Sequence, residues 1–430
     1  MSPALFADYL EAFRHFDRNT RLILLTSVLI GLTIFGGIYS VLLNLYLLRL
    51  GYDTAFIGDV NAAGALAFVV CSLPAGALGR KWGNRPMLVA GLGLAVLGHG
   101  LLPLGEYFTA TQQRYWLLGS MTLGSAGTNM YFVNVFPFLM AATRPQQRNH
   151  VFSLQMAISP LAAFAGSLIG GFLPGLYAAL LDTNLDQPAA YRYPLLLAAV
   201  FLAAALILVA RTRPIKTTIA SESTAPQSTT RRGRPPYKLF IVMGAVTFFQ
   251  TSGEGVARTF FNVYLDDALG LSTALIGTLS AGGQLLAVGA ALAAPLLARY
   301  WDRRHIILGG SLGMSLCLIP LALASHWIVA GLGFMGLIAM GAGRRPIYIV
   351  FQQESVSPDW RITMSSAVSM SYGLSLTLIS YKGGRLIAAW GYDALFLGAA
   401  LVTLVGTLIF WLYFRPTGKQ GNAPYKQSRI

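Results

Sequence analysis

The sequence contains little charge for its length. Only 11% of its 430 residues are Asp, Glu, Lys or Arg, whereas soluble domains carry about 25%. Hydrophobic residues make up 55% of the chain, and the mean hydropathy is +0.59. Apolar runs reach about 20 residues, the length that a helix needs to cross a bilayer. These features exclude a soluble fold and predict an all-α membrane protein.

Cysteine is scarce, and the motifs of several enzyme classes are missing. Cys71 and Cys317 both fall in apolar segments, so we expect neither a disulfide framework nor a metal site. The sequence has no Walker phosphate loop, no His-Glu-x-x-His and no Gly-x-Ser-x-Gly. An ATP-driven pump and a membrane hydrolase are therefore disfavoured. We expect no catalytic residues, no metal and no cofactor.

Acidic residues are about half as frequent as basic ones, 16 against 31, which gives a formal net charge of +15. Such an excess can indicate nucleic-acid binding, but here the basic residues follow membrane topology. With the amino terminus placed inside, 23 lysines and arginines fall in predicted inner segments and only three in outer loops. This bias obeys the positive-inside rule. We expect a cell (inner) membrane protein with both termini cytoplasmic, contact with anionic lipid and no nucleic-acid partner.

Apolar runs and polar breaks divide the chain. We expect an amphipathic amino-terminal segment at 1–21, a six-helix half at 22–210, a cytoplasmic linker at 211–236, a second six-helix half at 237–414 and a cytoplasmic tail at 415–430. The linker is rich in Thr, Ser, Pro and Arg and is expected to be flexible. The first span is predicted as one helix at 22–48. The fifth, at 151–181, is expected to be interrupted by its prolines, Pro160 and Pro174.

A repeat relates the two halves. The tetrapeptide Asn-Leu-Tyr-Leu at 44–47 recurs as Asn-Val-Tyr-Leu at 262–265. Basic positions also correspond at a shift of 219 residues, Arg80 with Arg299 and Arg85 with Arg304. Both copies run in the same order and direction, so we predict twelve transmembrane helices in two parallel six-helix repeats. Transporters with this architecture hold their substrate between the halves, near the bilayer midplane.

The predicted inner loop after the second helix carries a recognisable motif. It reads Gly76-Ala-Leu-Gly-Arg-Lys-Trp-Gly83-Asn-Arg85. This resembles the signature of the major facilitator superfamily, Gly-x-Leu-x-Asp-Arg-x-Gly-Arg-Arg/Lys, except that Arg80 stands where the family usually has Asp. The resemblance covers nearly the whole chain and implies the fold of that family.

The resemblance also implies a charge network that latches the halves on the inner side. The gating loops that would carry this latch contain Gly76, Arg80, Gly83, Arg85, Arg299, Arg304, Glu354 and Arg361. Arginine replaces the family's Asp in both copies of the motif. One rewiring of the latch would pair Arg299 with Glu354.

In that family the first, fourth, seventh and tenth helices line the central cavity, and the seventh and tenth carry charge here. Glu254 lies 17 residues after Tyr237, near the middle of the bilayer, and Arg258 follows one turn later. Arg344 and Arg345 lie in the tenth span. Adjacent helical residues point about 100° apart, so only one of them can face the cavity, and we favour Arg345. Because charges at this depth are costly, we expect these four residues to bind substrate and to couple transport to protons.

Other polar or aromatic side chains are candidates for lining the cavity: Tyr39, Asn44, Asn129, Tyr131, Asn134, Phe261, Asn262 and Lys382. For any single one of the polar residues, a hydrogen bond between helices is the more frequent role. Lys382 has a second interpretation, because a lysine near the end of a span can extend to the membrane surface.

The predicted function is secondary active transport of a small organic solute by alternating access, coupled to protons and carried out by a monomer. Three arginines around one glutamate make the cavity net positive, so we expect a substrate with an anionic head. One alternative is a multidrug/proton antiporter that exports amphiphilic compounds. Its pocket would use aromatic residues such as Phe35 and Phe132. Another alternative is a transporter-like receptor that binds its ligand without moving it.

Overall fold

The computed structural model describes residues 16–144, 147–214, 236–323, 326–357 and 360–415. Regular structure within these ranges is helical. The first half comprises α2 (Arg18–Thr33), α3 (Ile38–Arg49), α4 (Thr54–Val70), α5 (Ser72–Trp82), α6 (Asn84–Leu101), the 3-10 helix η1 (Leu102–Tyr107), α7 (Ala110–Ala142), α8 (Arg148–Leu180) and α9 (Ala189–Ala210). The second half comprises α10 (Tyr237–Asp267), α11 (Thr273–Tyr300), α12 (Arg303–Leu323), α13 (Trp327–Glu354) and α14 (Arg361–Phe414).

The first span is broken, so the expectation of one helix at 22–48 is wrong. Gly36 has φ +88°, in the left-handed region that glycine tolerates. The Ser40 hydroxyl accepts from the Gly36 amide at 2.9 Å and donates to the Ile34 carbonyl, and the Ser167 hydroxyl donates to the Gly36 carbonyl. These side chains replace the backbone bonds lost at the break, which makes it tolerable at membrane depth.

Prolines and glycines act differently in the other spans. The expected interruption of the fifth span is wrong, because α8 runs unbroken through Pro160 and Pro174. The 54-residue α14 contains non-helical dihedral angles at Gly391, where φ is +82°. At about 1.5 Å per residue this helix would be far longer than a bilayer is thick, so the break divides it into two spans.

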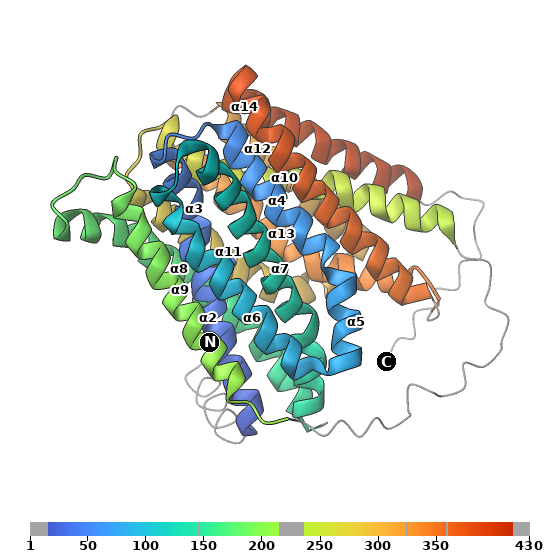
Figure 1. The fold of residues 1–430 in the computed structure, drawn as a ribbon. Coiled ribbons are helices and arrows are strands. Elements are labelled where there is room, and N and C mark those ends of the chain that lie inside the picture. Colours follow the sequence, from blue (N-terminus) through green and yellow to red (C-terminus); the bar gives the residue numbers. More distant parts are fainter. Residues whose placement is uncertain (1–15, 145–146, 215–235, 324–325, 358–359, 416–430) are drawn as a thin grey trace, which may run out of the picture.

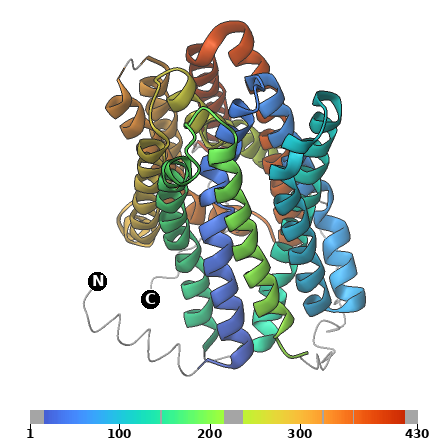
Figure 2. The same ribbon diagram turned by 60° about the vertical axis from the view of Figure 1, so that its left-hand side comes forward.

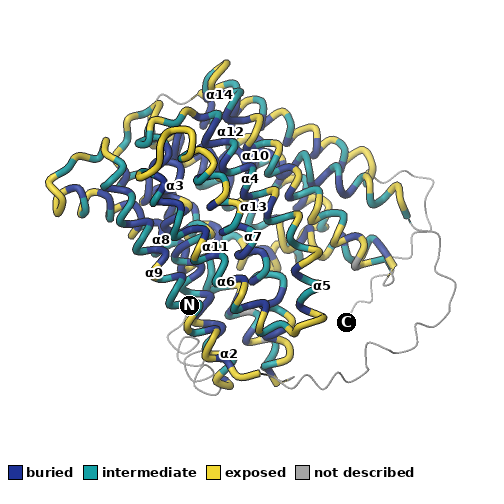
Figure 3. The backbone as a smooth tube through the Cα atoms, viewed as in Figure 1, coloured by how far each residue is buried: buried dark blue, intermediate teal, exposed yellow. Residues whose placement is uncertain are grey.

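Among the described residues, nine helices are long and apolar enough to cross a membrane, or ten when α4 and α5, bent by 41°, form one span. The 33-residue α7 is as long as these but less apolar, and α14 counts as two spans. The helices thus agree with a twelve-span bundle. They run side by side (Figure 2), with buried residues inside and exposed ones around the periphery (Figure 3).

The two halves meet mainly along two pairs of helices, α4 with α14 and α8 with α11, and also where α3 packs on α10. The halves can be followed in Figure 1 as the blue-to-green and the yellow-to-red helices. Glycine permits the close approach of α8 and α11, because a Cβ on Gly277 would lie only 2.5 Å from the Cα of Gly171. In the first half α2 and α7 lie between α4 and α8, and in the second α10 and α13 lie between α14 and α11. These four central helices therefore belong to the faces that the halves turn toward each other.

Polar bonds between the halves gather toward one end of the bundle. We call this the Arg49 end, and the opposite end, where α2 begins, the Arg18 end. Near the Arg49 end, Tyr191 lies 3.2 Å from Thr273 across the interface, oxygen to oxygen, and the Thr54 hydroxyl donates to the Gly384 carbonyl at 3.0 Å. This structure is thus tied together at the Arg49 end.

Candidate functional site

Glu254 is the centre of a charged cluster on α10. Its side chain is only 8% exposed. Arg258, one turn along the same helix, donates from Nε to Glu254 Oε1 at 2.9 Å. Arg345 of α13 donates from Nη2 to both carboxylate oxygens, at 3.2 and 3.4 Å. Two guanidinium groups from two helices therefore neutralise one buried carboxylate, as a charge at this depth requires.

The two arginines that hold Glu254 are themselves accessible. The side chain of Arg258 is 39% exposed and that of Arg345 is 50% exposed, although both lie well inside their spans. Arg345 also donates to the Tyr372 hydroxyl at 3.4 Å, so it links α10, α13 and α14. An arginine is costly in hydrocarbon. We therefore infer that these guanidinium groups face water between the halves.

Arg344 points elsewhere, as its position next to Arg345 requires. It is 8% exposed, donates from Nη1 to Gln250 Oε1, and lies 5.2 Å from the centre of the Tyr348 ring. Within the described part of the chain, Arg344 Nε and Gln250 Nε2 are buried donors without a hydrogen-bond partner. The cluster thus holds three arginines against one glutamate, with donors to spare.

Asn44 and Asn262 join the halves. Asn44 Nδ2 donates to the Thr259 carbonyl at 2.6 Å, and Asn262 Nδ2 donates to the Ser40 carbonyl at 2.8 Å. Their side-chain oxygens accept from Asn61 at 2.8 Å and from Ser280 at 3.1 Å, respectively. Both amides thus bond across the halves, which is the interhelical role that is more frequent for such residues, and their contact with a substrate stays a prediction.

Several other residues that were expected to line the cavity form hydrogen bonds within their own half. The Tyr39 hydroxyl lies 2.9 Å from the carbonyls of both His99 and Leu195. Asn129 donates to Ser72 Oγ at 2.9 Å. Asn134 donates to the Met130 carbonyl at 2.9 Å and to the Ala75 carbonyl at 3.3 Å. Burial and these bonds give all three side chains interhelical roles in this structure, and their place in the cavity stays a prediction.

The three remaining candidates differ in their exposure. Phe261 stacks on Phe334 with ring centres 3.8 Å apart and is 1% exposed, so it is a packing residue rather than a cavity residue. Lys382 is exposed and lies 5.7 Å from the centre of the Tyr381 ring. Tyr131 is also buried but lines a cavity in the first half.

Four residues expected to contribute to a latch, Arg85, Arg304, Glu354 and Arg361, bond to groups of their own half in this structure. Glu354 pairs with Arg303, which corrects the pairing with Arg299. Arg85 donates to the Ala210 carbonyl at the end of α9, and Arg304, its equivalent in the repeat, donates to the Phe414 carbonyl at the end of α14. Both arginines therefore satisfy the last carbonyls of a helix.

Arg148 and Arg361, which occupy equivalent positions in the two repeats, also make equivalent hydrogen bonds. Arg148 donates to the Met140 carbonyl at 3.4 Å, and Arg361 donates to the Gln353 carbonyl at 3.2 Å, eight residues earlier in each case. Gly83 has φ +91° at the junction of α5 and α6, a conformation that explains glycine in the motif. Gly76 is half-buried on α5, whereas Arg80 and Arg299 are exposed.

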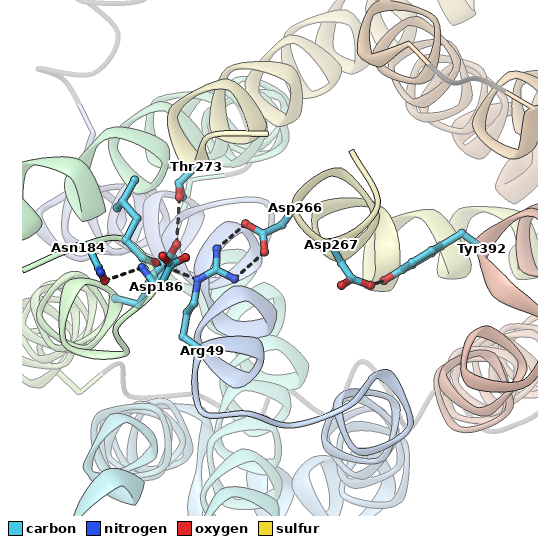
Figure 4. Close-up of polar contacts among 9 residues, drawn as sticks. Arg49, Asn184, Asp186, Asp266, Asp267, Thr273 and Tyr392 are labelled. Carbon is cyan, nitrogen blue, oxygen red and sulfur yellow. Dashed lines mark hydrogen bonds and ion pairs between the residues drawn. The ribbon is translucent and has the colours of Figure 1, made fainter. Parts of the chain in front are cut away.

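Sequence reasoning missed two ion pairs across the halves. Arg49 at the end of α3 and Asp266 at the end of α10 form a forked pair with both N–O distances at 2.7 Å (Figure 4). Arg385 of α14 donates to Asp59 of α4 at 2.6 Å. The available signal was opposite charge at matching ends of different spans, which alone does not select partners.

No metal-binding group emerges from the described residues: no three His, Cys, Asp or Glu side chains lie close enough to hold an ion. The buried His99 is engaged through Nδ1, which lies 3.0 Å from the Ala95 carbonyl. The charged cluster around Glu254 therefore remains the candidate functional site.

Comparisons with known proteins agree with this architecture. The model of the Major Facilitator Superfamily matches residues 22–378 and 243–429. The D-xylose-proton symporter superposes with a TM-score of 0.74 at 14% identity, covering 94% of this chain and 99% of that one. A point mutant of the nucleoside transporter NupG gives 0.72 at 14% identity, covering 93% and 100%.

A third structure, an inward-facing bacterial homolog of the human lysosomal transporter Spinster, gives a TM-score of 0.71 at 13% identity, covering 99% of this chain and 100% of that one. No curated protein matches the sequence. At these identities the solved structures establish the fold alone. The family model, which spans nearly the entire sequence, establishes more: this chain is a member of the Major Facilitator Superfamily, a family of membrane transporters.

Proposed function

We propose that this protein is a secondary transporter of small organic anions, coupled to protons. The observation that carries the proposal is the cluster in which Arg258 and Arg345 hold Glu254 while remaining 39% and 50% exposed. A cationic pair that is both mid-span and accessible is suited to exchange one carboxylate for another. Arg344, buried beside them without a carboxylate bonded to it, adds further positive potential.

The substrate's anionic group would compete with Glu254 for the guanidinium of Arg345. Arginine presents its donors in a planar fork that matches a carboxylate or a phosphate, and such charge-assisted bonds are among the strongest in proteins. Arg345 uses only one of its terminal nitrogens, Nη2, for Glu254 and Tyr372. Its exposed fork can therefore begin to bind a substrate before Glu254 is released.

Proton coupling follows from the burial of Glu254. Once substrate occupies Arg258 and Arg345, the carboxylate loses the hydrogen bonds that compensate its buried charge. A buried and unpaired carboxylate is costly, so Glu254 takes up a proton or turns toward Arg344. The first response links substrate binding to proton binding at one site, which is the requirement for symport.

The topology indicates from which side of the membrane the arginines are accessible in this structure. We propose that the halves span 22–210 and 237–414, joined by the linker 211–236 and flanked by cytoplasmic segments at 1–21 and 415–430. The Arg18 end would be cytoplasmic, because the lysines and arginines gather there. With the halves tied together at the Arg49 end, the arginines would be reached from the cytoplasm. Rocking of the halves would then expose them to the other side.

The test is a thermal-shift screen of the purified protein with organic anions, organic cations and neutral solutes at pH 5.5 and 7.5, followed by uptake into proteoliposomes. A ligand that binds only the folded state raises the melting temperature as its occupancy rises. We expect stabilisation by anions that is lost in Arg345→Ala and kept in Arg144→Ala, a control at an exposed arginine. Stabilisation by all three classes in both variants would contradict the proposal.

A second candidate is the exporter of amphiphilic compounds. Phe35, which is 45% exposed, packs edge to face with Phe132 at 5.0 Å and with Phe68 at 6.4 Å. Accessible aromatic groups of this kind suit apolar ligands. Stabilisation by cationic or apolar compounds alone would favour this function over anion transport.

A further inference from the structure

The first half contains a partly open cavity of about 240 Å³ that is lined by α2, α7 and α8. Its walls include the aromatic rings of Tyr131, Phe132 and Phe136 and the polar side chains of Ser27 and Gln155. The polar pair is satisfied internally: the Ser27 hydroxyl lies 2.9 Å from Gln155 Oε1, and Gln155 Nε2 lies 2.7 Å from Ser27 Oγ. The cavity is therefore mostly apolar, with an aromatic lining.

One polar group on the wall has no partner. Tyr131 is 1% exposed, and within the described part of the chain its hydroxyl makes no hydrogen bond of good geometry, although the Ser27 side chain lies near it. A buried hydroxyl without a partner costs about 1–3 kcal/mol, so such groups are rare unless something binds them. Tyr39, by contrast, lies 2.9 Å from two carbonyls. The hydroxyl oxygen of Tyr131 lies just behind the cavity wall, so a ligand bonds to it only when the Tyr131 side chain turns toward the cavity.

The cavity and the arginines lie at similar depth in opposite halves. Tyr131 is 11 residues from the end of α7 at Ala142, and Arg345 is nine residues from the end of α13 at Glu354. Both helices end at the Arg18 end, so these residues lie about 17 and 14 Å from it along their helices, at 1.5 Å per residue. Two of the helices that line the cavity, α2 and α7, are central helices of the face that the first half turns toward the second.

We propose that this cavity receives the uncharged ring of the transported anion. The substrate class is then an aromatic or other cyclic carboxylate whose ring carries a hydrogen-bond acceptor for Tyr131. An apolar cavity of about 150 Å³ is enough to bind benzene, so 240 Å³ accommodates one substituted ring. The inference rests on the proposed function, because the carboxylate is held by Arg345 in the other half. One molecule would thus contact both halves.

The experiment compares acetate, benzoate, the three hydroxybenzoates and neutral benzyl alcohol as ligands of the full-length protein, by calorimetry and thermal shift. We expect benzoate to bind about tenfold or more tightly than acetate, because it buries a ring. The best hydroxybenzoate should exceed benzoate by roughly threefold to tenfold, as one hydrogen bond provides. Tyr131→Phe should remove only this last advantage. Tyr115→Phe, at a 73% exposed tyrosine on the same helix, should retain it.

A second variant tests the cavity without the hydroxyl. Met156 lines it and is 59% exposed, so Met156→Trp narrows the cavity from an accessible position. We expect weaker binding of benzoate and unchanged binding of acetate. If Met156→Trp leaves benzoate binding unchanged and Tyr131→Phe leaves the order of ligands unchanged, the ring does not enter the cavity, although anion transport stands. If none of the anions binds, or if benzyl alcohol binds as tightly as benzoate, the proposed function is wrong. This inference, which rests on it, is then wrong as well.

Discussion

Asn44 and Asn262 occupy equivalent positions in the two sequence repeats, and each donates to a backbone carbonyl on the other's helix. Asn44 Nδ2 lies 2.6 Å from the Thr259 carbonyl, and Asn262 Nδ2 lies 2.8 Å from the Ser40 carbonyl. The repeat in sequence thus becomes a reciprocal contact in space. Because both bonds cross between the halves, the halves cannot separate here without breaking them.

The reciprocal asparagines predict a shift in conformational population. The double variant Asn44→Ala/Asn262→Ala removes two interhelical hydrogen bonds of about 0.6 kcal/mol or more each. We expect the state that is open at the Arg49 end to become roughly tenfold more populated. Spin labels at Ala110 and Ala268, exposed positions in opposite halves near that end, report the distance. Asn184→Ala, at an exposed asparagine, is the control, and an unchanged distance distribution in the double variant would contradict the prediction.

The forked pair of Arg49 and Asp266 predicts a coupling energy at the same end. The side chains are 19% and 8% exposed, so the pair lies between a buried ion pair and a surface one. We expect a coupling of about 2 kcal/mol. A double-mutant cycle with Arg49→Met and Asp266→Asn measures it in the melting temperature. Additive effects of the two substitutions would show that the pair does not stabilise this state.

Close packing of α8 on α11 predicts a steric effect of glycine substitution. Gly277→Val places side-chain atoms against the Gly171 backbone, where a Cβ alone would come within 2.5 Å of the Cα. We expect the halves to be forced apart and the transport rate to fall about tenfold or more, because small residues permit this approach. Gly289→Val on the same helix is the matched control, since nothing lies within 4 Å of its added Cβ. Equal losses in the two variants would indicate a general loss of α11 stability.

Glu254 predicts a separation of proton-driven accumulation from exchange. Glu254→Gln keeps the size of the side chain but cannot release a proton at any working pH. We expect uptake driven by a pH gradient to be abolished in proteoliposomes and counterflow exchange to persist. Glu106→Gln, which affects a carboxylate paired with Arg192 near the Arg49 end, should leave both activities intact. Persistence of gradient-driven accumulation in Glu254→Gln would give Glu254 a structural role only.

The adjacent arginines of α13 predict different defects. Arg345 is half exposed, and Arg258 still neutralises Glu254 without it, so Arg345→Met should lower affinity for anions about tenfold or more and lower the melting temperature less than Arg344→Met does. Arg344 is buried with Gln250 and Tyr348, and its removal leaves Gln250 Oε1 without this donor. Arg344→Met should therefore change mainly the melting temperature. Calorimetric titration beside thermal unfolding separates the two, and identical defects would show that the arginines act as one unit.

The spans, their order and the family followed from the sequence, because hydropathy, charge bias and repeats depend only on the order of residues along the chain. The depth of Glu254 in its span was likewise a matter of counting residues. The break in the first span was not predictable in this way, because Gly36 in a helical run is compatible with an unbroken helix. It depends on Ser40 and Ser167 replacing the lost backbone bonds.

The hydrogen-bond and ion-pair partners of the polar residues could be identified only from the tertiary structure. The sequence suggested Arg299 as the partner of Glu354, whereas the packing of α12 against α13 gave it Arg303. That Arg344 and Arg345 point apart followed from the sequence, but the rotation of α13 decided that Arg345 donates to Glu254 and Arg344 to Gln250. Asn44 was recognised from its repeat, but its bond to the other half depends on how closely α3 approaches α10. Composition and periodicity thus determined which segments cross the membrane, whereas helix rotation and packing, which sum many weak contacts distant in sequence, decided which side chains meet.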